Sequence, residues 1–373
     1  MERISFESLY DAYLDCRIHK STTYNAEEFE MNAMFNVQRL LDEINSGAYR
    51  LSPSQCFLVF VPKVREVFCA SFRDRVVHHW MMRELTPCIE RHLIYDNANC
   101  RIGKGTDFAL RRVRTFISRI TDNHENDDFY CLKIDLSAFF MSIDRQKLLD
   151  MTQKLIETDY RGKYPETLRH LLRIYLETDV TEKCIFKTAR KRWKLLPPEK
   201  SLFGNSHGLA IGNLPSQILS NLYLAPLDHL IKHDLKCRYY MRYVDDAIIL
   251  GRTKSELEEV LDRIRRFLPE LNMRLNMKKT RIFHAGYGIP FLGKILYPYH
   301  SVLSKDMIHR MWSQSYSFRN AQETYESMAG RRGIFVRYKC RCVMERWYDR
   351  LPYFIRRHYK MGSDMKSYLL SEI

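Results

Sequence analysis

Two adjacent carboxylates interrupt an apolar stretch between Arg238 and Gly251, which reads RYYMRYVDDAIILG. The β-favouring residues on both sides predict two strands, with Asp245 and Asp246 at a tight turn between them. Because a buried carboxylate without a partner is costly, adjacent acids at the end of apolar strands indicate bound cations, most simply magnesium. The core of the chain is therefore expected to form around a hairpin that carries charge at its tip.

The size and charge of the chain limit its class. Its 373 residues are 45% hydrophobic, enough for one enzyme-sized body of two or three lobes. A net charge of +15 favours a polyanionic partner, either nucleic acid or an anionic membrane surface. Because the sequence has no apolar run of about 18 residues and no signal-peptide h-region, we expect a soluble intracellular protein. Ten cysteines lack the CxxC spacing of a zinc or redox site, which favours reduced thiols in a core.

Hydrophobic periodicity predicts a mixture of helices and strands. Residues 1 to 48 are expected to be helical, with an imperfect stripe formed by Phe29, Met34, Leu40, Leu41 and Ile44. Further helices are expected over residues 72–92, 165–177, 215–230 and 253–268. A hairpin with a charged tip is expected between residues 55 and 68, and strands are expected over residues 130–140, 275–283 and 289–296.

Two segments concentrate positive charge next to aromatic side chains. Residues 187 to 194 place Lys and Arg around Trp193, which suits stacking on bases or gripping phosphates; a solvated loop is the alternative. Residues 301 to 373 hold 14 Lys and Arg against 7 Asp and Glu, with interleaved aromatics. This pattern favours a basic helical lobe that lies on nucleic acid, and a partner-protein surface is the competing interpretation.

A third carboxylate, Asp135, also ends an apolar strand, 110 residues before Asp245. Strand-end carboxylates in a cationic chain indicate a two-metal site, where ions about 3.5 to 4 Å apart stabilise the attacking and leaving oxygens of a phosphoryl displacement. Four further stretches accompany them: PKVRE (62–66), RDRVV (73–77), KIDLSAFF (133–140) and FLG (291–293). The order of these motifs, between residues 35 and 297, resembles that of reverse transcriptases.

The resemblance implies an α+β fold of the right-hand polymerase type, with fingers, palm and thumb and a helical N-terminal extension. It predicts six consecutive segments: the N-terminal extension (1–48), fingers (49–130), a first palm segment with the first catalytic motif (131–150), a fingers return with a basic insertion (151–205), the rest of the palm (206–297) and a basic helical thumb (298–373).

The same resemblance implies roles for individual residues. Asp135, Asp245 and Asp246 would be catalytic and would bind two Mg²⁺ ions, with Mn²⁺ as a substitute, together with the backbone of Leu136. Lys279, in the motif from residue 275 to residue 280, would protonate the pyrophosphate leaving group. The implied nucleotide-binding residues are Lys63, Arg65, Arg75, Phe140, Ile211, Gly212 and Gln217. The implied primer- and template-binding residues are Tyr243, Phe291, Leu292, Gly293, Arg101 and Lys104.

One stretch, GLAIGNLPSQILSN from Gly208 to Asn221, departs from the Gln-Gly-x-x-x-Ser-Pro pattern of most reverse transcriptases. It has Ile211-Gly212 and Ser216-Gln217 instead, which resembles the reverse transcriptases of diversity-generating retroelements, as does EKSLF over residues 199–203. Replacing a hydrogen-bonding Gln by Ile removes a polar contact near the nascent base pair, so geometric selection should loosen. A buried Ile that fills a pocket at a helix start is the alternative.

Membership of that group implies an RNA-directed DNA polymerase that copies a template-repeat RNA with errors opposite adenines, for mutagenic retrohoming. The implied partners are the template-repeat RNA, a cDNA primer and product, dNTPs and a basic oligomeric accessory protein, with no membrane partner. The implied location is the cytoplasm, for a bacterial or phage-encoded protein.

Three alternatives compete with this interpretation. A phage-defence or retron-like reverse transcriptase is close in length, although the retron-type Asn-Ala-x-x-His and Val-Thr-Gly signatures are missing. A group II intron maturase would need a longer domain after residue 300 than this chain provides. A degenerate polymerase that serves as an RNA-binding scaffold is disfavoured, because Asp135, Asp245, Asp246 and Lys279 are all present.

Overall fold

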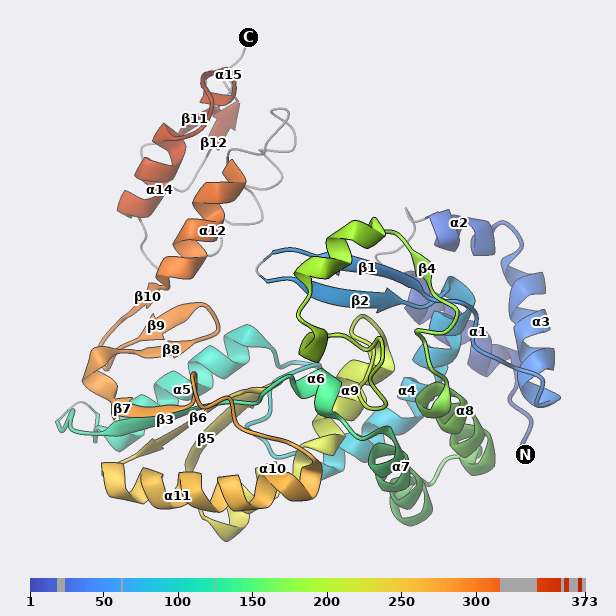
Figure 1. Ribbon diagram of the computed structural model, residues 1–373, viewed down its shortest axis with the longest axis horizontal. Coiled ribbons are helices and arrows are strands. Elements are labelled where there is room, and N and C mark those ends of the chain that lie inside the picture. Colours follow the sequence, from blue (N-terminus) through green and yellow to red (C-terminus); the bar gives the residue numbers. More distant parts are fainter. Residues whose placement is uncertain are drawn as a thin grey trace. The chain divides into compact units, whose positions relative to one another are not determined.

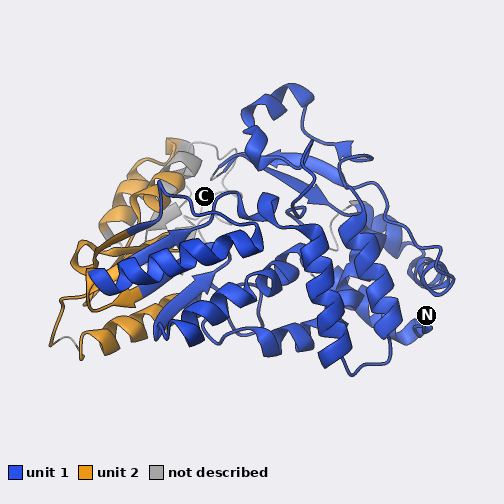
Figure 2. Cartoon of the chain, turned by 60° about the horizontal axis from the view of Figure 1, so that its bottom comes forward, with its two compact units in different colours: residues 1–109, 132–249, 255–281 blue, residues 110–131, 250–254, 282–373 orange. Residues whose placement is uncertain are grey.

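A computed structural model describes residues 1–18, 24–61, 63–123, 125–315, 341–356, 359–361 and 368–370. The chain forms two compact units, shown in different colours in Figure 2. Unit 1 contains residues 1–109, 132–249 and 255–281, and unit 2 contains residues 110–131, 250–254 and 282–373. The predicted boundaries of fingers, palm and thumb do not follow this division and stay predictions.

The N-terminal part of unit 1 is helical, as expected. It consists of α1 (Phe6–Arg17), α2 (Tyr24–Glu30) and α3 (Ala33–Asn45), followed after a hairpin by α4 (Phe72–His92). Helix α4 packs against α1, and the Nε1 of buried Trp80 donates a 2.8 Å hydrogen bond to Ser8 Oγ. The predicted stripe on α3 is wrong at Met34, which is 59% exposed; Val37, one turn further on, is buried instead.

The predicted hairpin is formed by β1 (Gln55–Val59) and β2 (Arg65–Cys69), which pair antiparallel. The short strand β4 (Ile185–Phe186) adds to β1 in parallel, so the sheet order is β2-β1-β4 (Figure 1). The basic segment that follows contains the 3₁₀ helix η1 (Arg190–Leu195). Its Trp193 packs edge-on against Phe186 and Phe203, with ring centroids 5.1 and 5.3 Å away. The indole therefore anchors this segment to the protein, and its stacking on a base stays a prediction.

The remaining elements between residues 106 and 271 are mostly helical. They are α5 (Thr106–Ile120), α6 (Phe139–Ser142), α7 (Arg145–Asp159), α8 (Pro165–Glu177), η2 (Pro198–Lys200), α9 (Leu214–Tyr223), α10 (Ala225–His229), η3 (Leu230–Asp234), α11 (Lys254–Phe267) and η4 (Leu268–Leu271). The single helix expected over residues 215–230 is wrong, because it breaks between α9 and α10. Pro226 explains the break, since proline lacks an N–H and its ring clashes with the carbonyl four residues earlier.

A four-stranded sheet carries the two acidic motifs. Its strands are β5 (Tyr239–Tyr243), β6 (Asp246–Gly251), β3 (Tyr130–Asp135) and β7 (Arg281–His284), in the order β5-β6-β3-β7 (Figure 1). Strand β3 ends five residues earlier than expected, because Ala138 adopts a left-handed backbone with φ 45° and α6 begins directly after it. The strand expected over residues 275–283 begins only at Arg281, because the preceding residues bind the backbone of Asp135.

Unit 2 contains a second small sheet in the order β10-β9-β8, formed by β8 (Ile289–Phe291), β9 (Lys294–Leu296) and β10 (Ser301–Leu303), with η5 (Ala285–Tyr287) before it. Leu292 and Gly293 form the β8–β9 turn, with φ 49° and 78°. The later elements are α12 (Lys305–Ser315), α14 (Arg341–Asp349), α15 (Tyr353–Arg356), β11 (Tyr359–Met361) and β12 (Tyr368–Leu370). The predicted basic helical lobe lies in part outside the described residues. Among the described residues, none of the helices combines the length and the hydropathy that a membrane span requires.

Candidate active site

Three carboxylates meet at one end of the four-stranded sheet. Asp135 is the last residue of β3, Asp246 is the first residue of β6, and Asp245 lies in the β5–β6 turn. Because β3 and β6 are neighbours, these positions fall close enough that the Asp135 charge acts on both other carboxyls. The structure thus brings together the three carboxylates that the sequence motifs predicted.

Lysines bind two of the carboxylates. The Nζ of Lys279 lies 2.8 and 2.7 Å from the two oxygens of Asp135, and Asn276 Nδ2 donates a 3.0 Å hydrogen bond to the same carboxylate. The Nζ of Lys133 lies 3.3 Å from Asp246 Oδ1. Lys133 and Asn276 were not predicted as site residues. The signal for Lys133 was its position two residues before Asp135, because residues i and i+2 of a strand share a face.

Burial determines the electrostatics of the turn. Desolvation raises the pKa of Asp245, and the nearby Asp135 charge adds to the effect. Desolvation also raises the pKa of Asp246 to about 6, against the opposing attraction of Lys133. Both carboxylates are therefore harder to ionise than a solvated aspartate unless a cation compensates their charge.

The donor set fits magnesium, which prefers carboxylate and carbonyl oxygens. Asp246 Oδ1 is buried, and its contact in the described residues is the Lys133 ammonium 3.3 Å away, so a divalent cation could take the place of that ammonium. Across the described ranges, no group of three His, Cys, Asp or Glu side chains is arranged to hold a metal ion as it stands. The carboxylates of Asp135 and Asp246 contact lysine ammonium groups instead.

The turn between β5 and β6 is strained. Val244 has φ 58°, a left-handed conformation that a β-branched residue rarely adopts. Such a backbone costs about 1 to 3 kcal/mol and persists only where surrounding contacts hold it. Strain of this kind clusters at functional sites, and here it lies next to Asp245.

Three predicted nucleotide-binding residues lie together. The side chains of Phe140 and Ile211 both pack against a buried cluster formed by Cys56, Phe68, Met141, Leu202 and Ala210. The carbonyl of Ile211 accepts a 2.8 Å hydrogen bond from the N–H of Phe68, in β2. Gly212 has φ 119°, and a Cβ there would lie 2.7 Å from the Phe68 carbonyl oxygen. Ile211 and Gly212 therefore join β2 to the start of α9. The nucleotide-binding roles of Phe140, Ile211 and Gly212 stay predictions.

The other predicted nucleotide-binding residues differ in their surroundings. Lys63 and Arg65 are exposed at the tip of the β1–β2 hairpin. Gln217 is exposed on α9 and accepts a 3.1 Å hydrogen bond from the thiol of Cys100. Arg75 binds within the chain, because its Nε donates to the carbonyl of Ala70 at 2.9 Å.

The predicted primer and template contacts fall in both units. In unit 1, Tyr243 is half-buried, and its pKa is raised by burial. Arg101 binds Glu90 and the carbonyls of Ile94 and Asn97, and Lys104 donates to the carbonyl of Tyr95. In unit 2, Phe291 ends β8, and Leu292 and Gly293 form the β8–β9 turn. The contacts of Arg101 and Lys104 give both a structural role, and all six binding roles stay predictions.

A family model described as reverse transcriptase (RNA-dependent DNA polymerase) matches residues 61–296, which include all three carboxylates and Lys279. The chain belongs to the reverse transcriptase family. The enzyme class expected from the sequence, RNA-directed DNA polymerase, is confirmed by this match.

Relatives of this reverse transcriptase occur in distant organisms. It is 24% identical over 294 residues to Protein YkfC of Escherichia coli strain K12. That match covers 69% of this chain and 70% of Protein YkfC. It is 25% identical over 228 residues to Nuclear intron maturase 4, mitochondrial, of Arabidopsis thaliana. That match covers 60% of this chain and 24% of the maturase.

Among solved structures, the reverse transcriptase resembles apo telomerase from Candida tropicalis, with a TM-score of 0.50 and 12% identity. The match covers 80% of this chain and 52% of the telomerase chain, so this chain spans about half the length of that protein. At this identity the likeness concerns the fold alone. It confirms the α+β right-hand polymerase expected from the sequence.

Proposed function

We propose that this reverse transcriptase copies a template-repeat RNA into mutagenised cDNA for targeted diversification of a protein, with errors concentrated opposite template adenines. Its partners are that RNA, a cDNA primer and product, dNTPs and a basic oligomeric accessory protein. The proposal rests on the stretch from Gly208 to Asn221, whose Ile211-Gly212 and Ser216-Gln217 resemble the enzymes of diversity-generating retroelements.

The proposed chemistry is nucleotidyl transfer at Asp135, Asp245 and Asp246. These carboxylates and the backbone carbonyl of Leu136 would hold two magnesium ions, which supply charge compensation for the attacking and leaving oxygens when bound. Lys279 carries its ammonium 2.7 Å from Asp135 Oδ2, at the edge of the site. From that position Lys279 would donate a proton to the pyrophosphate oxygen as it leaves.

The observation that carries the proposed infidelity is the position of Ile211. Its backbone is fixed by the 2.8 Å hydrogen bond with Phe68, and its side chain packs against the same apolar cluster as Phe140. An isoleucine in this position offers no hydrogen bond to a base pair. Selection there would depend on shape alone, which discriminates less than a site that hydrogen-bonds its substrate.

The test is to sequence cDNA made on a defined RNA template by the wild-type enzyme and by Ile211→Gln. We expect wild-type errors to concentrate opposite adenines and the variant to reduce them roughly 5- to 10-fold, the effect of about one hydrogen bond. Ile185→Gln is the matched control, because Ile185 is 52% exposed on β4. A wild-type enzyme with low and even errors would instead favour the phage-defence or retron-like alternative. Equal error rates in wild type and Ile211→Gln would show that Ile211 does not cause the errors opposite adenines.

A further inference from the structure

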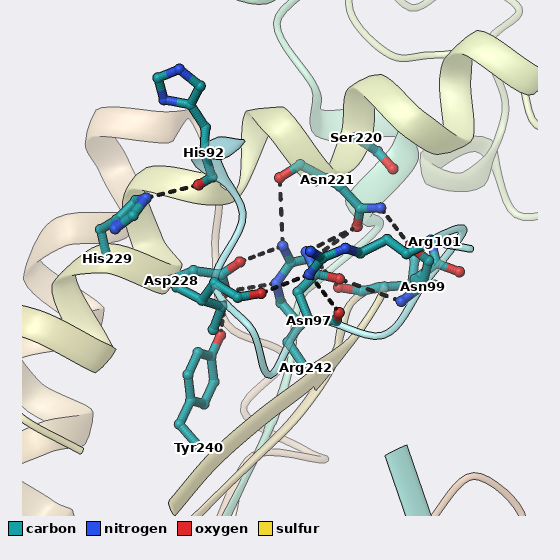
Figure 3. Close-up of polar contacts among 12 residues, drawn as sticks. His92, Asn97, Asn99, Arg101, Ser220, Asn221, Asp228, His229, Tyr240 and Arg242 are labelled. Atoms are coloured by element: carbon teal, nitrogen blue, oxygen red, sulfur yellow. Dashed lines mark hydrogen bonds and ion pairs between the residues drawn. The ribbon is translucent and has the colours of Figure 1, made fainter. Parts of the chain in front are cut away.

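A buried arginine lies directly before the strained turn that carries Asp245. Arg242 is in β5, and its side chain is 2% exposed. Its Nε and Nη2 donate hydrogen bonds of 2.7 and 2.6 Å to the two carboxylate oxygens of Asp228, which is fully buried on α10 (Figure 3). This two-bond geometry suits a guanidinium and cannot be reproduced by lysine.

The third nitrogen of the same guanidinium reaches the turn. Arg242 Nη1 donates a 3.0 Å hydrogen bond to the carbonyl of Val244, the residue with the left-handed backbone. The same Nη1 lies 3.4 Å from Asn221 Oδ1, on α9. Arg242 therefore connects two helices to the peptide unit that precedes Asp245.

A second layer of contacts surrounds the ion pair. The hydroxyl of Tyr240 donates to Asp228 Oδ1 at 2.7 Å, and Asn221 Nδ2 donates to the carbonyl of Asn99 at 2.8 Å (Figure 3). The backbone of Arg242 also pairs with residues 96–98, through its N–H to Asp96 O and from Ala98 N to its own carbonyl, both at 3.1 Å. Both the main chain and the side chain of Arg242 are thus held by neighbouring segments.

A buried ion pair is expensive to desolvate and is often no more stabilising than apolar residues of the same volume. Stability alone therefore gives a weak reason for a charged pair at this place. The hydrogen bond to Val244 gives a stronger one, because it acts on the backbone conformation that orients the next two carboxylates.

We propose that Arg242 is a positioning residue for the metal-binding turn: it holds the Val244 carbonyl, and thereby the left-handed turn, so that Asp245 and Asp246 face Asp135. Asp228 and Asn221 support it by fixing the guanidinium. The inference rests on the proposed two-metal chemistry, since the turn is held in place for magnesium.

The test compares Arg242→Met with Arg242→Met/Asp228→Asn. The single variant leaves the Asp228 carboxylate buried without its partner and should lower the melting temperature. The double variant removes that charge, keeps an acceptor for Tyr240 and should regain the stability. Both should need about 10-fold more Mg²⁺ for half-maximal primer extension and lose about 10- to 100-fold in kcat, the effect of a small misplacement of catalytic groups.

Tyr240→Phe is the matched control, because it removes one hydrogen bond to Asp228 and leaves the contact with Val244 intact. It should lower the melting temperature slightly and leave the Mg²⁺ midpoint unchanged. If the stable double variant shows the wild-type Mg²⁺ midpoint and kcat, Arg242 is only structural and the inference is wrong. A wild-type enzyme whose primer extension does not respond to Mg²⁺ would overturn the two-metal proposal itself, which keeps the two failures distinct.

Discussion

Lys279 binds both carboxylate oxygens of Asp135, with its Nζ 2.8 Å from Oδ1 and 2.7 Å from Oδ2. The ammonium and a divalent cation would compete for these oxygens, because each would neutralise the same carboxylate. Lys279 is 47% exposed, so it can move away from Asp135 at little cost in stability. The same side chain can therefore neutralise Asp135 when no metal ion is bound. In the proposed mechanism it also donates a proton during turnover.

Replacing Lys279 by Met should separate metal binding from catalysis. Without the competing ammonium, the Mg²⁺ concentration for half-maximal activity should fall several-fold, whereas kcat should fall about 10²-fold through loss of the proton donor. Primer extension across an Mg²⁺ series measures both quantities. Lys278→Met, at the exposed neighbouring lysine, is the control. An unchanged kcat would remove Lys279 as the acid.

Asp245→Asn should abolish RNA-templated primer extension, by at least about 10³-fold or ~4 kcal/mol of activation free energy. Because burial raises the pKa of Asp245, removing its charge should raise the melting temperature in the presence of a chelator. Asp262→Asn, which breaks an exposed ion pair with Arg266 on α11, should change neither value. An active Asp245→Asn enzyme would mean that the metal ligands are assigned wrongly.

Gly212→Ala should destabilise unit 1 more than Gly204→Ala. Both glycines have positive φ, but only at Gly212 would a Cβ collide with neighbours, at 2.7 Å from Phe68 O and from Val67 Cγ1. We expect a loss of about 1 kcal/mol for Gly204→Ala from backbone strain and about 2 to 4 kcal/mol for Gly212→Ala. Urea unfolding measures both. Equal losses would show that β2 can shift away from Gly212.

The buried imidazole of His78 should make the protein sensitive to acid. His78 is 2% exposed on α4, and neither ring nitrogen has a hydrogen-bond partner in the described residues. Burial lowers its pKa from 6.5 to about 3, so the unfolded chain binds a proton first as the pH falls. Its stability contribution is complete above pH 6.5 and is lost toward pH 3, by on the order of 5 kcal/mol.

His78→Leu should therefore flatten the dependence of the free energy of unfolding on pH between 6.5 and 3. Chemical denaturation at several pH values measures the slope. His207→Leu, at an exposed position, is the control for the loss of one imidazole. The same slope in wild type and His78→Leu would contradict the prediction.

Local signals predicted the helices well. Helices α4 (Phe72–His92) and α8 (Pro165–Glu177) match the expected ranges, because each start is marked in the sequence. Ser71 caps α4 by accepting from the N–H of Asp74, and Pro165 suits the first position of α8. Strand β3 was predicted too long, because nothing in the residue type of Ala138 indicates its left-handed backbone.

The motifs predicted the three carboxylates and Lys279 but not the other residues that surround them. Lys133 could have been found from its shared strand face with Asp135. Arg242 gave a weaker signal: an arginine inside an apolar strand needs a buried acidic partner, but the sequence does not say which one. The partner, Asp228, comes from a helix whose packing against β5 is a tertiary property.

The contact between Lys279 and Asp135 also has a consequence for biosynthesis. Ribosomes add about 5 to 20 residues per second, so Lys279 is made on the order of 10 s after Asp135, given their separation of 144 positions. Throughout that interval the nascent chain carries Asp135 without the lysine and without the segment that closes over its backbone. Contacts between such distant residues are slow to form, so the active site is expected to be among the last parts of unit 1 to mature.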